Sequence, residues 1–146
     1  MSTNTLSTHI IAVYGNLREG LSHHNLIANC KPIGLGWLTG FRMYNLGDFP
    51  AIVPTLDESG RIRVEWYQVS DPLLSELDKL LEFDKSALPS SKHIRKRIFS
   101  PYGKGWIYIY NQPLENAPYM EAGDWTRFLK EQTPLDPEAS LAAQWA

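Results

Sequence analysis

The chain has 146 residues, of which 43% are hydrophobic, and this is enough for one domain with a single core. Its 14 basic and 16 acidic side chains give a net charge of −2, so no overall field would attract nucleic acid or an anionic membrane, and small neutral or zwitterionic partners are favoured. Cys30 is the single cysteine, which excludes an internal disulfide framework, and no apolar run approaches the ~20 residues that cross a bilayer.

In chain order, the sequence begins with a polar segment, residues 1–8, that is expected to be flexible. This segment lacks the basic start and apolar core of a secretory signal, so a cytoplasmic location is predicted. Apolar periodicity then predicts strands at about residues 9–15, 35–45, 50–55, 61–69, 93–100 and 105–111.

Helices are predicted between and after these strands. Ser22 can cap a short helix that reaches about residue 30. Asp71 is predicted to cap the clearest helix, because Pro72 then takes the first helical position, where no N–H donor is needed. The apolar face of that helix is Leu73, Leu74, Leu77, Leu80 and Leu81. A last helix covers about 124–131, and a tail follows at 134–146. Antiparallel strands with segregated helices predict an α+β fold in one domain, residues 1–146.

The turn after the first strand, Val13 to Gly20, is polar and contains the glycines Gly15 and Gly20. Glycine permits backbone angles that other residues resist, and successive unpaired N–H groups in such a loop form a concavity that favours carboxylate or phosphate oxygens. The turn therefore predicts an anion-binding loop. The alternative is an ordinary strand-to-helix turn.

Six segments of the chain match, in order, the motifs of one protein family. The first, Tyr14 to Gly20, is similar to the signature Y-G-[ST]-L-[KR]-x-G. The others are Gly36 to Tyr44, Phe49 to Pro54, Val64 to Val69 followed by Leu77 and Asp78, Gly105 to Tyr110, and Ala122 to Trp125. On these segments, which extend over about residues 10–128, the chain resembles the gamma-glutamylcyclotransferase-like proteins, a group that includes the AIG2-like and gamma-glutamylamine cyclotransferase proteins.

The resemblance implies a small mixed, mainly antiparallel β-barrel with flanking helices. It also implies a reaction in which the α-amine of a γ-glutamyl group attacks its own γ-carbonyl, releasing an amine and 5-oxoproline. Because the nucleophile is tethered, the protein needs no covalent one. It needs a carboxylate that deprotonates the ammonium and fixed N–H donors for the α-carboxylate and the developing oxyanion.

The same resemblance assigns roles to particular residues. The loop residues Tyr14, Gly15, Asn16 and Leu17 are expected to bind the substrate. Tyr110 is expected to line the pocket, because the family has pocket tyrosines on this strand, and Tyr108 on the same strand is the alternative. No cofactor is predicted.

The expected acid–base residue is displaced by one position. The family pattern L-D-x-x-E places a glutamate three residues after the aspartate, whereas Glu82 lies four residues after Asp78. The consensus position falls on Leu81 in the apolar arc, and a straight helix would point Glu82 at solvent. A helix that ends before Glu82, or a single π-type bulge, would return it to the site. Phe83 and Asp84 resemble the aromatic and acidic pair that follows the family's glutamate, so Glu82 is the predicted catalytic residue, with Asp78 and Asp84 in reserve.

Other conspicuous residues have simpler interpretations. The four histidines have no metal-ligand spacing and are expected at the surface or in loops, so no metal site is predicted; they are His9, His23, His24 and His93. The basic run 92–97 is most simply a solvated strand face, with a substrate-carboxylate or phosphate contact as alternatives. Neither a nucleic-acid nor a membrane partner is predicted, and the sequence indicates no oligomeric state.

Two functions of different class are compatible with these features. The first is an enzyme that acts on a γ-glutamyl amine, a γ-glutamyl amino acid or a lysine side-chain conjugate. The second is a non-catalytic relative that binds a small carboxylate-bearing ligand or a protein partner in the same pocket, since a fold alone guarantees no activity. The displaced glutamate keeps the second function open.

Overall fold

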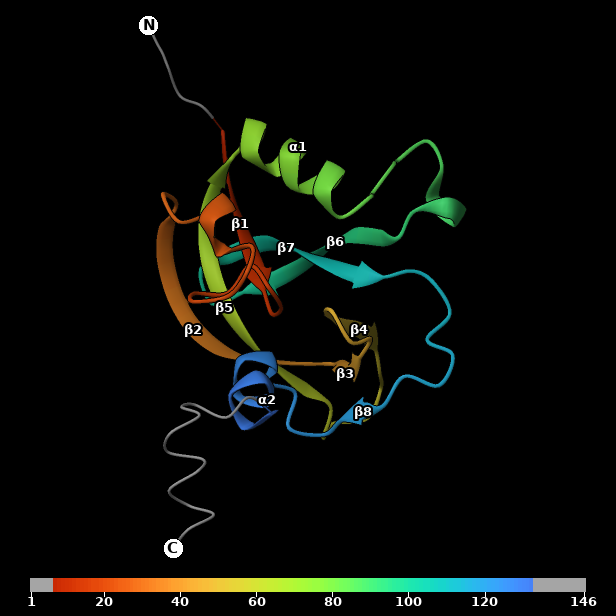
Figure 1. Ribbon diagram of the computed structural model, residues 1–146. Helices are drawn as coiled ribbons and strands as arrows, with labels where there is room; N and C mark the ends of the chain where they lie inside the picture. Colours follow the sequence, from red (N-terminus) through yellow and green to blue (C-terminus); the bar gives the residue numbers. More distant parts are fainter. Residues whose placement is uncertain (1–6, 133–146) are drawn as a thin grey trace, which may run out of the picture.

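The computed structural model describes residues 7–132 of the chain. Its elements, shown in Figure 1, are the strands β1 (Thr8–Val13), β2 (Lys31–Thr39), β3 (Phe41–Asn45), β4 (Pro50–Pro54), β5 (Arg61–Ser70), β6 (His93–Ser100), β7 (Gly103–Tyr110) and β8 (Tyr119–Met120), and the helices α1 (Asp71–Leu80) and α2 (Trp125–Gln132). Short 3₁₀ turns lie at His24–Leu26 and Leu88–Ser90. The expected tail at 134–146, and most of the expected flexible start at 1–8, lie outside the described residues, although Thr8 already belongs to β1.

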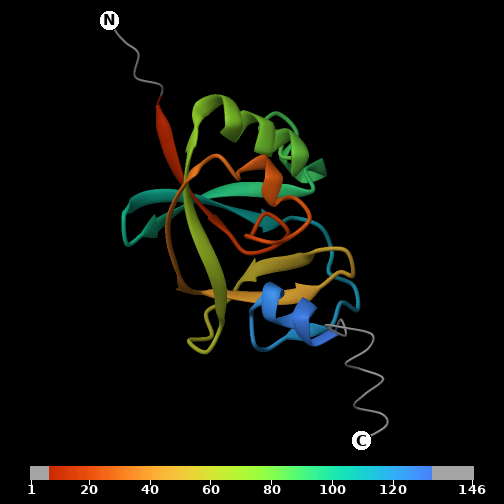
Figure 2. The same ribbon diagram turned by 60° about the vertical axis from the view of Figure 1, so that its left-hand side comes forward.

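The strands form two sheets. The larger has the order β2-β5-β1-β7-β6, in which only β1 and β7 are parallel, and the smaller has the order β4-β3-β8. The predicted α+β class is confirmed. The small mixed β-barrel that the resemblance implies is not confirmed, because the described strands pair within two separate sheets (Figure 2). The chain leaves the larger sheet at Gly40, whose φ of +93° is a left-handed conformation that suits glycine, so the single strand predicted over 35–45 is two strands, β2 and β3.

The middle of the larger sheet is covered on both faces, which is why β1 reads as a continuous apolar run. One face packs against the smaller sheet and α2, in a cluster that includes Ala12, Met43 and Trp125. The other face packs against α1, in a cluster that includes Ile11 and Leu77. Figure 1 shows α1 and the smaller sheet on opposite sides of the larger sheet. The C-terminal end of β1 therefore lies in the middle of the molecule.

The two predicted helix starts before residue 75 need correction. Ser70 caps α1, because its hydroxyl oxygen accepts a hydrogen bond from the N–H of Leu73, and Asp71 is the first helical residue. The helix predicted after Ser22 is only the 3₁₀ turn His24–Leu26, which has no side-chain cap. Within residues 7–132, no helix has the length and apolar content that a membrane crossing requires.

Candidate active site

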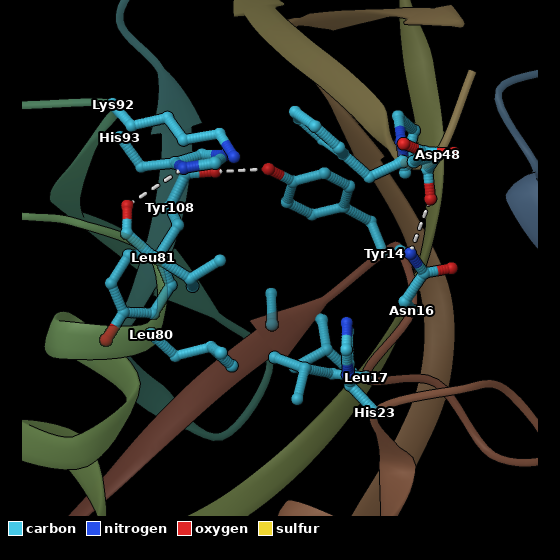
Figure 3. A pocket seen from close by; sticks show the side chains of 15 residues that line it. Tyr14, Asn16, Leu17, His23, Asp48, Leu80, Leu81, Lys92, His93 and Tyr108 are labelled. Atoms are coloured by element: carbon cyan, nitrogen blue, oxygen red, sulfur yellow. Dashed lines mark hydrogen bonds between the residues drawn. The ribbon is translucent and has the colours of Figure 1, made fainter. Parts of the chain in front are cut away.

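A cavity of about 190 Å³ lies at the end of β1 (Figure 3). Its walls come from residues 12–17, from His23, from residues 48–50 before and at the start of β4, from Leu80 and Leu81 at the end of α1, from Lys92 and His93 at the start of β6, and from Tyr108. Four of the predicted substrate-binding residues, Tyr14, Gly15, Asn16 and Leu17, are in this wall. The cavity thus lies where segments distant in sequence meet.

The loop Tyr14 to Leu17 is held by its side chains. The Tyr14 hydroxyl donates to the carbonyl oxygen of Tyr108 at 2.6 Å, and burial raises the pKa of this phenol above its ordinary range. The Asn16 amide donates to the Asp48 carbonyl oxygen at 2.8 Å and accepts from the Trp125 indole at 2.8 Å. These bonds fix the loop without using its backbone donors.

The backbone of the loop is available for a ligand. No hydrogen bond to any residue in 7–132 engages the N–H groups of Gly15, Asn16 and Leu17. A Cβ on Gly15 would lie 3.1 Å from two side-chain carbons of Pro50, so only glycine fits this approach easily. Unpaired N–H groups at a cavity wall are suited to carboxylate oxygens.

A buried arginine anchors the same loop. Arg18 is only 6% exposed; its guanidinium donates to Glu65 of β5 at 2.9 Å and to Asp124, just before α2, at 2.8 Å. Burial alone would raise the pKa of Glu65, but hydrogen bonds from the Glu19 N–H, Arg18 and the Tyr67 hydroxyl outweigh it and hold this pKa below its ordinary value. The pKa of Asp124 is lowered in the same way, with burial opposed by Arg18 and the Arg127 N–H.

Glu82 lies just outside the cavity. Helix α1 ends at Leu80, and Glu82 follows with a left-handed φ of 55°. Its N–H donates to the Lys79 carbonyl at 3.1 Å, and the Phe83 N–H donates to the Asp78 carbonyl at 2.9 Å, which is the pattern of a Schellman motif. The helix therefore ends before Glu82, as one of the two expected arrangements requires.

The Glu82 side chain is at the rim rather than in the wall. It is 67% exposed, and its carboxylate lies 3.8 Å from the ammonium of Lys92. Lys92 does line the cavity, as do Leu80 and Leu81, which precede Glu82. The carboxylate is thus one side chain away from the cavity.

The two reserve carboxylates have other partners. Asp78 accepts from the Tyr108 hydroxyl at 2.7 Å and pairs with the Arg95 guanidinium at 2.9 Å. Asp84 accepts from the hydroxyl and the N–H of Ser86, and these bonds lower its pKa. Neither residue lines the cavity.

The strand β7 contributes Tyr108, the alternative tyrosine, to the wall. Tyr110 stands behind the wall, with its ring centroid 5.6 Å from that of His93 and 6.0 Å from that of Phe49. It contacts the cavity wall through these two neighbours, which both line the cavity.

Sequence reasoning missed the polar side chains of His23 and Asp48 in the wall. Of the basic run 92–97, for which a substrate-carboxylate contact is one of the alternatives, Lys92 and His93 line the cavity. The expectation of a surface position is wrong for His93, which is 3% exposed. Its Nδ1 lies 3.0 Å from the Leu81 carbonyl oxygen. Periodicity holds no signal for this burial, because the residues that cover the ring come from other segments.

The site offers N–H donors, apolar walls, the Lys92 ammonium, the imidazoles of His23 and His93, and the Asp48 carboxylate. Such a set suits a small zwitterionic molecule with a carboxylate and an uncharged chain. Among the described His, Cys, Asp and Glu side chains, no three gather closely enough to hold a metal ion.

Comparisons with known proteins point to one family. Residues 11–127 match the family model described as gamma-glutamyl cyclotransferase, AIG2-like. The chain is 30% identical over 115 residues to the gamma-glutamylcyclotransferase family protein YtfP of Escherichia coli K12, and the match covers 79% of this chain and 94% of that protein. It is 26% identical over 125 residues to the gamma-L-glutamyl-butirosin B gamma-glutamyl cyclotransferase of Niallia circulans, covering 80% of this chain and 74% of that protein.

Solved structures are similar as well. The solution structure of ytfP from Escherichia coli has a TM-score of 0.61 at 30% identity, and the match covers 85% of this chain and 99% of that one. The crystal structure of PH0828 from Pyrococcus horikoshii has a TM-score of 0.69 at 21% identity, covering 85% and 95%, which shows the shared fold.

Proposed function

The chain belongs to the AIG2-like gamma-glutamyl cyclotransferase family, and from this premise we propose that it releases 5-oxoproline from a γ-glutamyl amine or a γ-glutamyl amino acid. The observation that carries the proposal is the row of unengaged N–H groups at Gly15, Asn16 and Leu17 in the cavity wall. The printed name of the Niallia circulans relative, which refers to a γ-glutamyl compound, supports the substrate class.

In the proposed reaction the loop N–H groups hold an anionic oxygen of the γ-glutamyl group. The α-amine then lies within reach of its own γ-carbonyl, and ring closure needs only proton transfers and charge stabilisation. Glu82 is the proposed general acid–base, because its left-handed backbone places it at the cavity rim beside Lys92. Tyr110 is proposed to act indirectly, by supporting Phe49 and His93.

The first test is 5-oxoproline release by the wild type and by Glu82→Gln, with a panel of γ-glutamyl amines, γ-glutamyl amino acids and γ-glutamyl-ε-lysine. Loss of a general acid–base is expected to lower kcat by about 100-fold to 10,000-fold. Glu115→Gln is the matched control, since Glu115 is also exposed with φ 55° but, unlike Glu82, has no ion pair with a described residue of the cavity wall. Equal turnover by Glu82→Gln and the wild type would remove Glu82 from the mechanism.

A second function is favoured by one specific observation, the position of the Glu82 carboxylate outside the cavity. If no catalytic group reached the substrate, the same N–H groups would still bind a small carboxylate-bearing ligand or a protein partner. If calorimetry shows that the panel compounds bind and no 5-oxoproline is released from any of them, the protein is a binding protein rather than an enzyme.

A further inference from the structure

His93 is a buried base in the cavity wall that the proposed reaction does not use. It is the first residue of β6 and is 3% exposed. The rings of Phe49 and Tyr110 pack on it, with centroids 6.0 and 5.6 Å away. A polar ring buried in this way needs an explanation from its hydrogen bonds or from its chemistry.

One hydrogen bond fixes the tautomer of the ring. Nδ1 lies 3.0 Å from the Leu81 carbonyl oxygen, as Figure 3 shows. A carbonyl oxygen can only accept, so Nδ1 carries the hydrogen and the neutral ring has its lone pair on Nε2. No described residue forms a hydrogen bond with Nε2. This atom is nevertheless accessible, because it is not one of the fully buried polar atoms of residues 7–132 that lack a hydrogen-bond partner. Because the rest of His93 is covered and the ring lines the cavity, Nε2 faces the cavity.

We propose that His93 is a second proton-transfer residue of the cavity, whose Nε2 takes a proton from the substrate's α-ammonium and delivers it to the leaving nitrogen. This inference rests on the proposed cyclotransferase function and deepens it. The freed amine attacks the γ-carbonyl carbon, a C–N bond forms, and the bond to the leaving nitrogen breaks. The α-nitrogen loses two protons in total and the leaving nitrogen gains two, so the imidazole ends neutral, as it began.

The surroundings of the ring favour the neutral base. Burial is the largest influence on the pKa of His93 and lowers it, and the Lys92 ammonium lowers it further. The hydrogen bond to Leu81 and the Glu82 carboxylate raise this pKa, but the net result is a pKa below the ordinary 6.5. The other titratable groups in the cavity wall are the Asp48 carboxylate, the His23 imidazole and the phenols of Tyr14 and Tyr108. Near neutral pH the ring is therefore ready to accept a proton.

The carboxylate of Glu82 and the imidazole of His93 differ as proton acceptors. A carboxylate is in general a weaker acceptor for an ammonium proton than an imidazole, which is closer in basicity to the amine it must deprotonate. His93 is in the wall, and Glu82 is at the rim. Glu82 also faces Lys92, so part of its effect on turnover would be electrostatic.

The test compares kcat and KM for 5-oxoproline release by the wild type, His93→Asn and Glu82→Gln between pH 4.5 and 9. Asparagine places an amide nitrogen near the position of Nδ1, so the bond to Leu81 is kept while the titrating base is lost. We expect a loss of about 100-fold or more in kcat with KM changed by less than about 3-fold. The wild-type rate falls as the pH drops below 6.5, and this acid limb is absent in His93→Asn and present in Glu82→Gln.

Two further measurements separate catalysis from folding. His9→Asn is the control, since His9 lies in β1 and pairs with Asp71 away from the cavity, and it is expected to leave turnover unchanged. His93→Gly with added imidazole is expected to regain activity, which a merely structural role would not allow. If His93→Asn turns over at the wild-type rate, or if it keeps the acid limb of the wild type, the inference about His93 is wrong while the proposed function still stands. Absence of 5-oxoproline release by the wild type from every panel compound would instead refute the proposed function.

Discussion

At the scale of single residues, Glu82 occupies a backbone conformation that glutamate does not favour. Its φ of 55° is in the left-handed region, where the Cβ of an L-residue crowds the following carbonyl at a cost of roughly 1–2 kcal/mol. The position after a helix end of this kind usually holds glycine. Glu115 has the same φ, so what distinguishes Glu82 is its position at the cavity rim beside Lys92.

Replacing Glu82 by glycine is therefore expected to stabilise the fold and impair the reaction. Relief of the strain, partly offset by the larger entropy of glycine in the unfolded chain, should raise the free energy of unfolding by up to about 1 kcal/mol. Glu115→Gly, at the same φ of 55°, should give a similar gain in urea unfolding and keep full 5-oxoproline release. A lower stability of Glu82→Gly than of the wild type would mean that the pair with Lys92 outweighs the strain.

At the scale of elements, helix α1 connects the cap, the core and the cavity. Ser70 begins it by accepting the Leu73 N–H, Leu77 is buried in the core, and Leu80 reaches the cavity. The residue after its last turn is Leu81, whose carbonyl receives the His93 bond. Weakening the start of α1 is therefore expected to disturb this wall of the cavity as well as to lower the stability of the fold.

Ser70→Ala is expected to lower the free energy of unfolding by about 1 kcal/mol, because the Leu73 N–H loses its acceptor. Ser75→Ala, at an exposed position inside the same helix, should be neutral or slightly stabilising, since alanine is the better helix former. Urea unfolding of both variants measures the difference. Equal stability of the two would show that the Ser70 cap contributes nothing.

At the scale of the whole molecule, Arg18 joins three parts of the fold. It directly follows the loop Tyr14 to Leu17, pairs with Glu65 in the larger sheet and reaches Asp124 just before α2. The side chains of Arg18, Glu65 and Asp124 are 7%, 13% and 17% exposed, respectively, so both ion pairs are largely shielded from solvent. Removing the cation would leave two half-buried carboxylates without their partner.

Arg18→Met is expected to cost about 3 kcal/mol of stability at pH 7. The pKa values of Glu65 and Asp124 lie below the unfolded values, so the stabilisation is complete above pH 4.5 and is lost as the pH falls through the folded values. The stability gap between wild type and variant should therefore shrink from pH 5 to pH 3. Arg127→Met, which breaks an exposed pair with Glu131, should change stability by less than about 0.5 kcal/mol, and a gap independent of pH would contradict the assignment.

Local patterns in the sequence predict much of this protein. Apolar runs and alternation place β1, β5, β6 and β7 within one or two residues of where the structure has them, because these signals depend on neighbours along the chain. The glycine-containing turn predicts the loop at residues 14–17, and the order of motifs predicts the family. The helix α1 is predicted as well, although its cap is Ser70 rather than Asp71.

Tertiary structure alone decided how the strands divide into sheets and which polar side chains reach the cavity. The break at Gly40 sends β3 into a second sheet, and nothing in a strand-like apolar pattern tells one sheet from two. His93 carries no local sign of burial, because Phe49 and Tyr110, which cover it, come from segments that meet only in the fold. The backbone of Glu82 follows from where α1 stops, and that depends on how its last turn packs against the start of β6. The sequence by itself thus determined the elements and the turn at residues 14–17, which rest on local periodicity and turn chemistry, while contacts between distant segments decided which polar side chains line the cavity.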